Sequence, residues 1–408
     1  MALSGRRAWT LALVATLAMT VSYVDRQVIA AVATSMRKAL GFDAAHFGWL
    51  AGSFSAAYLV AAPLAGAVID KVGARRGLIA AVALWSAVSA AHAFAPSFAA
   101  LVALRVALAV CEAPSFPGAI QCVHRVLPTM RRSAAVGLLF TGSSLGAAIA
   151  APLAIGIDVK LGWRAAFLLT SVAGLAWIPL WQLATRGGEA RSLLAAPGSN
   201  GADKGAAVTV RWSLATNPVV LRAMALVLCS APALMFVFLW MPQYLEIARH
   251  VPKENLPRYV WLPPVMADAG MVAFGWLSDR LCAQSTRPAS GEWLVVAAGA
   301  LVSCLAFATT VRDTRAAVLL VGTGALGAGA LYTLLTTDMI ARIPPTQVST
   351  AGGMTAAAQS LTYVVLSPLV GWWVDRTRSF DAPLLVFGAV AVPGALAWSL
   401  ARRARPDG

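Results

Sequence analysis

Charged residues are scarce in this sequence. Only 12% of its 408 residues are Asp, Glu, Lys or Arg, about half the share in a typical soluble domain. Apolar runs of roughly 20 residues recur along the whole length, and each is long enough to cross a hydrocarbon core. The alternating apolar and polar pattern of outer-membrane β-strands is missing. We therefore predict an all-α integral membrane protein.

Residues that hold metals or form disulfides are also few. The chain has five cysteines and four histidines, and no pair of cysteines has CxxC spacing. No metal-ligand spacing, nucleophile motif or phosphate loop lies in or beside the apolar runs. We expect no disulfide, no metal site, no cofactor and no enzymatic activity.

The net charge of +15 is not gathered in one basic domain, which disfavours a nucleic-acid partner. In a membrane protein the placement of Lys and Arg predicts orientation, because they collect at cytoplasmic ends. We expect both termini to be cytoplasmic. The clusters behind this expectation are Lys71, Arg75 and Arg76; Arg125, Arg131 and Arg132; and Arg402, Arg403 and Arg405.

The apolar runs predict twelve membrane-spanning helices in two six-helix bundles. A polar segment at 185–216, rich in Gly, Ser and Asp, is interpreted as a cytoplasmic linker between bundles at 1–184 and 217–408. The predicted spans are 8–33, 47–69, 77–95, 98–122, 134–157, 163–184, 217–245, 258–278, 292–311, 315–341, 350–374 and 382–401.

The two halves share motifs, which predicts pseudo-symmetry between the bundles. Gly66-Ala-Val-Ile-Asp70-Lys71 follows the second span, and Gly275-Trp-Leu-Ser-Asp279-Arg280 follows the eighth. Ser-Leu and Pro-Leu pairs at the same spacing also occur in spans 5 and 11. Repeated halves are typical of transporters that work by alternating access, with the substrate site between the repeats.

Residues 66–76, GAVIDKVGARR, resemble the signature of the major facilitator superfamily between helices 2 and 3. Asp70 is expected at a cytoplasmic helix end, where it can pair with basic residues or cap a neighbouring helix. The resemblance implies a gate that holds the cytoplasmic side shut in one state. The predicted gating residues are Gly66, Asp70, Lys71, Gly73, Arg75, Arg76, Asp279 and Arg280.

Further motifs resemble the anion:cation symporter family of that superfamily. They are Tyr23-Val-Asp25-Arg26-Gln27, Glu112-Ala-Pro-Ser-Phe-Pro117, Gly162-Trp-Arg-Ala-Ala-Phe167 and Trp240-Met-Pro-Gln243-Tyr244-Leu245. Bacterial members of that family include hexuronate, galactonate and glucarate permeases. The resemblance implies the major facilitator fold, a bacterial inner-membrane location and a small organic anion as substrate.

Four charged residues fall within predicted spans: Asp25 and Arg26 in span 1, and Arg105 and Glu112 in span 4. Intramembrane charges are costly and usually functional. Arg105 and Glu112 are seven residues apart, so they share one helix face. Counting residues from the outer helix ends places Asp25 and Arg105 at one depth, which predicts an ion pair between them. Arg26 then faces the central cavity.

A guanidinium binds a carboxylate through two parallel hydrogen bonds, so we predict Arg26 as the substrate anchor. The resemblance implies the same role for it. Asp25 and Glu112 are predicted to carry the protons, and Arg105 is predicted to belong to the same proton-coupling group as their charged neighbour. A static ion-pair cluster joining helices 1 and 4 is the structural alternative. The other predicted substrate-binding residues are Tyr23, Gln243, Tyr244, Gln359 and Ser360.

We therefore predict a proton-coupled importer of a sugar acid or similar carboxylate, with protons and the lipid bilayer as its other partners. It is expected to act as a monomer. Aromatic or dicarboxylic substrates, exchange, uniport and sodium coupling stay open. Organic-phosphate exchange and drug efflux are disfavoured, because span 7 has no intramembrane basic residue and an arginine anchor does not suit cations.

Overall fold

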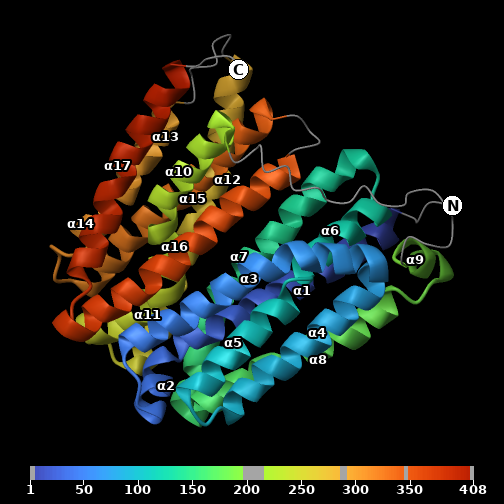
Figure 1. Cartoon of the computed structure of the whole chain (residues 1–408), viewed down its shortest axis with the longest axis horizontal. Coiled ribbons are helices and arrows are strands. Elements are labelled where there is room, and N and C mark those ends of the chain that lie inside the picture. Colours follow the sequence, from blue (N-terminus) through green and yellow to red (C-terminus); the bar gives the residue numbers. More distant parts are fainter. Residues whose placement is uncertain (1–4, 196–215, 285–291, 344–347, 405–408) are drawn as a thin grey trace. The chain divides into compact units, whose positions relative to one another are not determined.

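The computed structural model describes residues 5–195, 216–284, 292–343 and 348–404, and in these ranges the regular structure is entirely helical (Figure 1). Lipid offers no hydrogen-bond partners to the backbone, so helices that satisfy their own backbone groups are the expected solution. Nine of the described helical stretches are long and apolar enough to cross a membrane. The all-α membrane prediction is confirmed.

Each of the twelve predicted spans overlaps one helix or several consecutive helices. The chain divides into two compact units, residues 1–42 with 53–209 and residues 43–52 with 210–408. The first unit contains α1 (Gly5–Ala31), α2 (Ala33–Leu40), most of α3 (Ala44–Val72), α4 (Ala74–Ala91), η1 (His92–Phe94), α5 (Phe98–Glu112), α6 (Ser115–Val126), α7 (Thr129–Leu161), α8 (Trp163–Ala184) and α9 (Gly188–Leu193).

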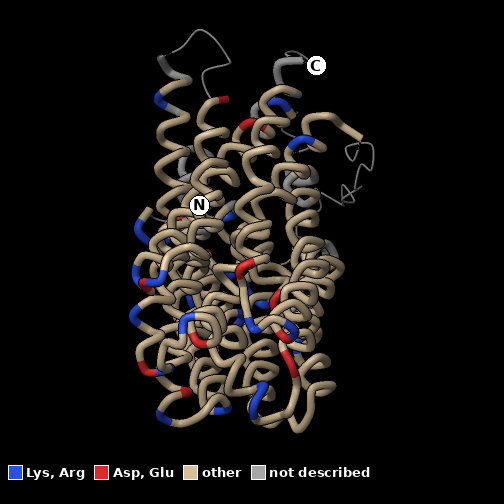
Figure 2. The backbone as a smooth tube through the Cα atoms, turned by 90° about the vertical axis from the view of Figure 1, so that its left-hand side faces the viewer, with Lys and Arg blue, Asp and Glu red and all other residues tan. Residues whose placement is uncertain are grey.

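The second unit contains the start of α3 and the remaining helices. They are α10 (Pro218–Met235), η3 (Phe236–Trp240), α11 (Met241–Gln243), η4 (Tyr244–Ala248), η5 (Lys253–Arg258), α12 (Leu262–Gln284), α13 (Glu292–Val302), α14 (Cys304–Phe307), α15 (Thr314–Arg342), α16 (Val348–Thr377) and α17 (Asp381–Ala404). Charged residues are sparse along the tubes in Figure 2.

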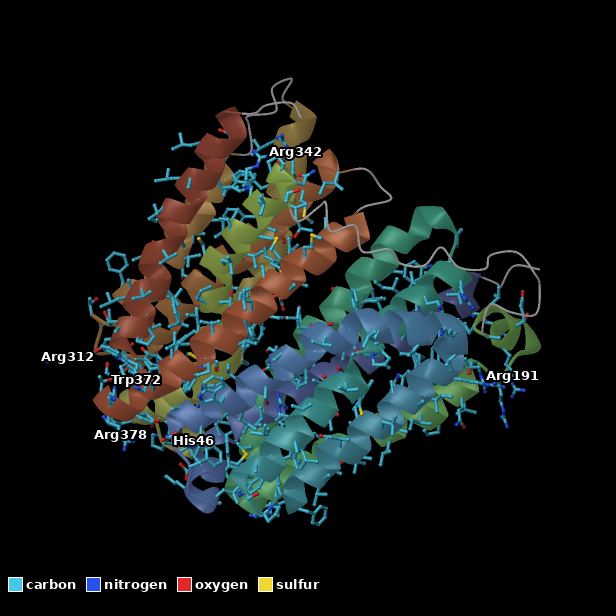
Figure 3. All side chains as sticks on the ribbon, viewed as in Figure 1. His46, Arg191, Arg312, Arg342, Trp372 and Arg378 are labelled. Carbon is cyan, nitrogen blue, oxygen red and sulfur yellow. The ribbon has the colours of Figure 1, made fainter. Side chains whose placement is uncertain are left out.

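The predicted domain boundaries differ from the units in two respects. Residues 43–52, placed by the sequence in the N-terminal bundle, group with the second unit. The predicted linker also contains a short helix, α9, whose Arg191 points away from the other helices in Figure 3. The Gly- and Ser-rich part of the linker, 197–205, lies outside the described residues.

Prolines interrupt two of the predicted spans. The fourth span is divided after Glu112, where Pro114 lacks the N–H that a continuous helix needs. The seventh span changes to π-helix on both sides of Pro242, over Phe236–Trp240 and Tyr244–Ala248. Such π-helical segments are rare in proteins, and those that occur often lie at functional sites.

Small residues allow the helices of each unit to cross closely. In the first unit α7 packs along α1, and a Cβ at Gly142 would lie 2.8 Å from the backbone oxygen of Thr16. In the second unit α15 packs along α12 and α13 through Gly322, Gly327 and Gly329. The runs at 141–151 and 322–330 therefore form the close crossings typical of membrane helices.

Gly142→Ala is expected to destabilise the protein, because overpacking a tight contact costs about 1–3 kcal/mol. Gly156→Ala is the matched control on the same helix, since nothing lies within 4 Å of a Cβ there. Thermal unfolding of the purified protein should show a lower Tm for Gly142→Ala alone. Equal Tm values for the two variants would contradict the close α1–α7 contact.

Candidate functional site

The four intramembrane charges lie together in the first unit, on α1 and α5. Asp25 and Glu112 have no exposed surface, and Arg105 is 3% exposed. The side chain of Arg26 keeps 19% exposure, so it is the member of the group that a solute can reach most easily. Glu112 is the last residue of α5, immediately before the break at Pro114.

Arg26 and Glu112 form an ion pair. Glu112 Oε2 accepts hydrogen bonds from Arg26 Nε at 3.1 Å and from Arg26 Nη2 at 3.0 Å. Two N–H groups of one guanidinium therefore converge on a single carboxylate oxygen. Glu112 Oε1 has no hydrogen-bond partner among the described residues.

The predicted Asp25–Arg105 ion pair is wrong for this structure. Asp25 Oδ1 instead accepts a hydrogen bond from Ser89 on α4, at 3.1 Å. Arg105 Nη2 donates to the backbone oxygen of Arg26 at 3.4 Å. Counting residues along a helix does not give the rotation of α1 and α5 about their axes, which decides which groups meet.

Arg105 and Asp25 have further unused bonding capacity. Arg105 Nε and Nη1, and Asp25 Oδ2, have no hydrogen-bond partner within the described part of the chain. Buried polar groups in native proteins are nearly always paired. The cluster can therefore accept additional polar groups, such as those of a water molecule or an anion.

Aromatic rings surround the Arg26 guanidinium. Its central carbon lies 4.7 Å from the ring centroid of Tyr23, 4.9 Å from that of Phe54 and 4.8 Å from that of Tyr58. The ring centroid of Phe54 also lies 4.7 Å from the central guanidinium carbon of Arg105. Phe54 and Tyr58 were missed by sequence reasoning, although their spacing of four residues puts them on one face of α3.

The four predicted binding residues of the second half lie in the second unit. Gln243 is fully buried, and Tyr244 is 1% exposed between Phe236 and Phe380. The Tyr244 hydroxyl accepts a hydrogen bond from Arg249 Nε at 2.7 Å. Gln359 and Ser360 are half-buried on α16. Their roles in substrate binding stay predictions.

The predicted gating motif forms the turn between α3 and α4. Gly73 has φ of +81°, a conformation that favours glycine, and it precedes the first residue of α4. Arg75 Nε donates to Thr185 Oγ1 at 3.1 Å, and Arg75 N donates to Leu194 O at 3.2 Å. The motif thus anchors the segment that follows α8.

The other predicted gating residues are exposed, make few contacts or lie outside the described side chains. Lys71 and Arg76 are exposed, and nothing lies within 4 Å of a Cβ placed at Gly66. Arg280 stacks on Trp276 at 3.7 Å. The side chains of Asp70 and Asp279 lie outside the described residues. The gating role of this set stays a prediction.

The described ranges contain no cluster of side chains suited to metal binding. No group of three His, Cys, Asp or Glu residues there could hold a metal ion. Cys111, Cys122, Cys229 and Cys304 are free thiols, and Cys282 falls outside the described side chains.

The family is decided by a match of residues 15–365 to the Major Facilitator Superfamily model. The chain belongs to this superfamily. It is therefore a multi-pass membrane transporter and not an enzyme, and the fold predicted from the sequence is confirmed.

Individual relatives agree with the predicted branch. The chain is 27% identical to the hexuronate transporter of Bacillus subtilis, over 93% of this chain and 91% of that one. It is also 27% identical to the probable sulfoacetate transporter SauU of Cupriavidus necator, over 92% and 90% of the two chains. The sugar-acid resemblance seen in the motifs is thus confirmed at the level of named relatives.

A solved structure confirms the fold. A bacterial homologue of the human lysosomal transporter Spinster superposes with a TM-score of 0.81 at 18% identity, covering 98% of each chain. At this identity the likeness concerns the fold alone, so the site has to be argued from the residues of this chain.

Proposed function

We propose that the protein is a proton-coupled symporter that carries a small organic anion, such as a sugar acid, into the cytoplasm. The observation that carries this proposal is the ion pair between Arg26 and Glu112, which joins an anion-binding group directly to an acid that can take up a proton.

Protonation of Glu112 would release Arg26 for the substrate. A neutral carboxyl group no longer attracts the guanidinium, and the two N–H groups that now bond to Glu112 Oε2 have the geometry that a substrate carboxylate needs. The rings of Tyr23, Phe54 and Tyr58 would hold the guanidinium in place during the exchange. Proton uptake and anion capture are thereby linked.

Asp25 is proposed as the second proton carrier. Burial favours the neutral form of a carboxyl group, and a nearby arginine favours the charged form. A change in the distance to Arg105 would therefore change whether Asp25 holds a proton. With two protons per monoanion, one net positive charge enters, which gains about 2.3 kcal/mol per 100 mV of inside-negative potential.

The named relatives support an acid as the substrate, because they are transporters of hexuronate and, probably, sulfoacetate. We further propose a monomer in the bacterial inner membrane with both termini in the cytoplasm. The clusters of Lys and Arg near the gating motif and at the C-terminus support this orientation.

A substrate with two acidic groups is the second candidate. Arg105 has two nitrogen atoms without a hydrogen-bond partner among the described residues, next to the arginine that we propose as the first anchor. A dicarboxylate, or a molecule with one sulfonate and one carboxylate, could engage both guanidinium groups.

Liposomes that contain purified protein and an internal pH dye test the proposal. Monocarboxylic sugar acids, dicarboxylates and sulfonated acids are added one at a time, with sodium present or absent. Internal acidification that needs one acid and no sodium is expected. Tracer exchange of an acid without any acidification would mean exchange, uniport or sodium coupling.

Phe54→Leu is expected to raise KM for the substrate roughly tenfold, because the ring face contacts both Arg26 and Arg105. Leucine keeps an apolar side chain but has no ring quadrupole to hold the guanidinium groups. Phe94→Leu is the control, since Phe94 is 74% exposed. Initial uptake rates measure the effect, and an unchanged KM for Phe54→Leu would argue against the aromatic support.

A further inference from the structure

A buried histidine, His92, belongs to the group of polar side chains around Arg105 in the first unit. It begins η1 at the end of α4 and has no exposed surface. Its Nε2 atom has no hydrogen-bond partner among the described residues, and the same holds for Asp25 Oδ2 and for Arg105 Nε and Nη1. Buried polar groups are nearly always hydrogen-bonded, so these atoms indicate a shared partner.

The hydrogen bond of the other ring nitrogen fixes the tautomer of His92. Nδ1 lies 2.8 Å from the backbone oxygen of Val88, and a carbonyl oxygen can only accept a hydrogen bond, so Nδ1 carries a proton. Because a charged ring is costly to bury, the imidazole is neutral and Nε2 is an acceptor. The ring also stacks on Phe167 of α8, with 5.0 Å between the centroids, which fixes its orientation.

Three neighbouring stretches of helix bring these polar groups together. Asp25 lies on α1, Ser89 and His92 lie at the end of α4 and the start of η1, and Arg105 lies on α5. Ser89 Oγ donates to Asp25 Oδ1 at 3.1 Å, and His92 follows Ser89 by three residues, so the two side chains face the same side. The positive charge of Arg105 acts on both Asp25 and His92. The guanidinium is therefore within electrostatic reach of both groups.

The atoms without partners complement one another as donors and acceptors. Arg105 Nε and Nη1 can only donate, whereas His92 Nε2 and an ionised Asp25 Oδ2 can only accept. None of these donors is bonded directly to either acceptor. A water molecule both accepts and donates, so it can accept from the arginine and donate to the imidazole and the carboxylate. Buried waters typically make about three hydrogen bonds of this kind.

We infer that His92 is a positioning residue for proton coupling: through enclosed water, its Nε2 atom holds the Arg105 guanidinium near Asp25 without a direct ion pair. This explains why Asp25 bonds to Ser89 and not to Arg105 in this structure. An arginine in direct contact favours the charged carboxylate, whereas a water-separated arginine lets Asp25 take up and release a proton. The role of Asp25 in this inference rests on the proposed function, but the hydrogen bonding of His92 does not.

Solid-state 15N NMR of the protein in lipid bilayers measures the hydrogen bonding of His92. Replacing His46, His124 and His250 by glutamine leaves His92 as the source of the imidazole signals; if that variant does not fold, the signals lost in His92→Gln identify it in the wild type. Nδ1 is expected to carry a proton, Nε2 to carry none, and magnetisation from water protons to reach Nε2. A proton on Nε2, or no transfer from water to it, would rule out the inference. No substrate is needed, so this result stands even if the proposed function fails.

His92→Phe is expected to lower the initial rate of substrate-driven proton uptake in liposomes roughly tenfold, because a direct ion pair with Arg105 would keep Asp25 charged. Phenylalanine keeps the shape of the ring and its stacking on Phe167, but it offers no acceptor to the water. Exchange of labelled for unlabelled substrate should persist, because exchange requires no net release of protons. A merely structural role of His92 would lower both rates alike.

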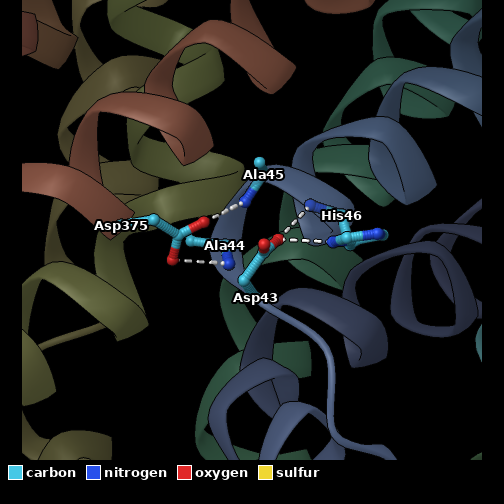
Figure 4. Close-up of polar contacts among 5 residues, drawn as sticks. All are labelled: Asp43, Ala44, Ala45, His46 and Asp375. Carbon is cyan, nitrogen blue, oxygen red and sulfur yellow. Dashed lines mark hydrogen bonds and ion pairs between the residues drawn. The ribbon is translucent and has the colours of Figure 1, made fainter.

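His92→Gln is the rescue variant, because its side-chain oxygen can replace Nε2 as the acceptor, and it should recover most of the proton uptake. His46→Phe is the matched control: His46 is exposed, and its Nδ1 lies 2.6 Å from Asp43 Oδ1 at the start of α3 (Figure 4). It should behave like the wild type. Size-exclusion profiles verify folding, and His92→Leu replaces His92→Phe if the latter does not fold. Wild-type proton uptake in the folded apolar variant, or an equal loss in His92→Gln, would overturn the positioning role.

Discussion

Arg26→Ala is expected to abolish substrate-driven proton uptake in liposomes, with kcat/KM at least about 100-fold lower. The substitution removes the proposed anchor, and it also leaves Glu112 buried without its ion-pair partner. Removing one member of a buried pair typically costs about 3–5 kcal/mol, so stability is measured on the same preparation. Arg26→Lys is expected to recover only a small part of the activity, because an ammonium lacks the planar fork of a guanidinium.

Two further variants separate a lost anchor from a lost fold. The double variant Arg26→Ala/Glu112→Gln removes both charges, and it should regain stability but not transport. Arg191→Ala, on the exposed surface of α9, should behave like the wild type (Figure 3). Substrate-dependent acidification that survives Arg26→Ala would remove Arg26 from the binding site.

Glu112→Gln is expected to uncouple the transporter. Glutamine imitates the protonated acid, so Arg26 would be free for substrate at every pH, and no proton would move with it at this position. Proton uptake should fall at least about tenfold, whereas exchange of labelled for unlabelled substrate should stay within about threefold of the wild type.

The pH dependence gives a second readout of the same variant. In the wild type, substrate affinity should rise as pH falls, because protonation of Glu112 releases Arg26. In Glu112→Gln this part of the dependence should vanish. Glu254→Gln changes an exposed acid and should keep the wild-type profile. A wild-type profile in Glu112→Gln would assign the coupling to Asp25 alone.

Together the two variants distinguish the proposed exchange of partners from a static ion-pair cluster. In a static cluster, neutralising either residue would lower stability and all transport modes alike. In the proposed mechanism only Arg26 variants lose exchange, because Arg26 binds the anion and Glu112 controls its release. The two hydrogen bonds from Arg26 Nε and Nη2 to Glu112 Oε2 couple these residues directly, so a change at either one should alter the state of the other.

The helices and the family could be predicted from the sequence because the bilayer imposes strong local rules. An apolar run long enough to cross lipid has to be helical, since its backbone groups find no other partners. The same rule made Asp25, Arg26, Arg105 and Glu112 conspicuous, because charges in such runs are rare. The motif at residues 66–76 indicated the superfamily that the comparison confirmed.

Only the tertiary structure decided which of these charges meet. Residue counting measures depth along a helix, but the rotation of α1 and α5 and the break at Pro114 brought Glu112 to Arg26 and Ser89 to Asp25. Phe54 and Tyr58 on α3 lie against the Arg26 guanidinium on α1, and Asp375 on α16 accepts a hydrogen bond from the start of α3. Each of these contacts joins segments that are distant in the chain. Such contacts depend on how helices pack, which no local pattern encodes.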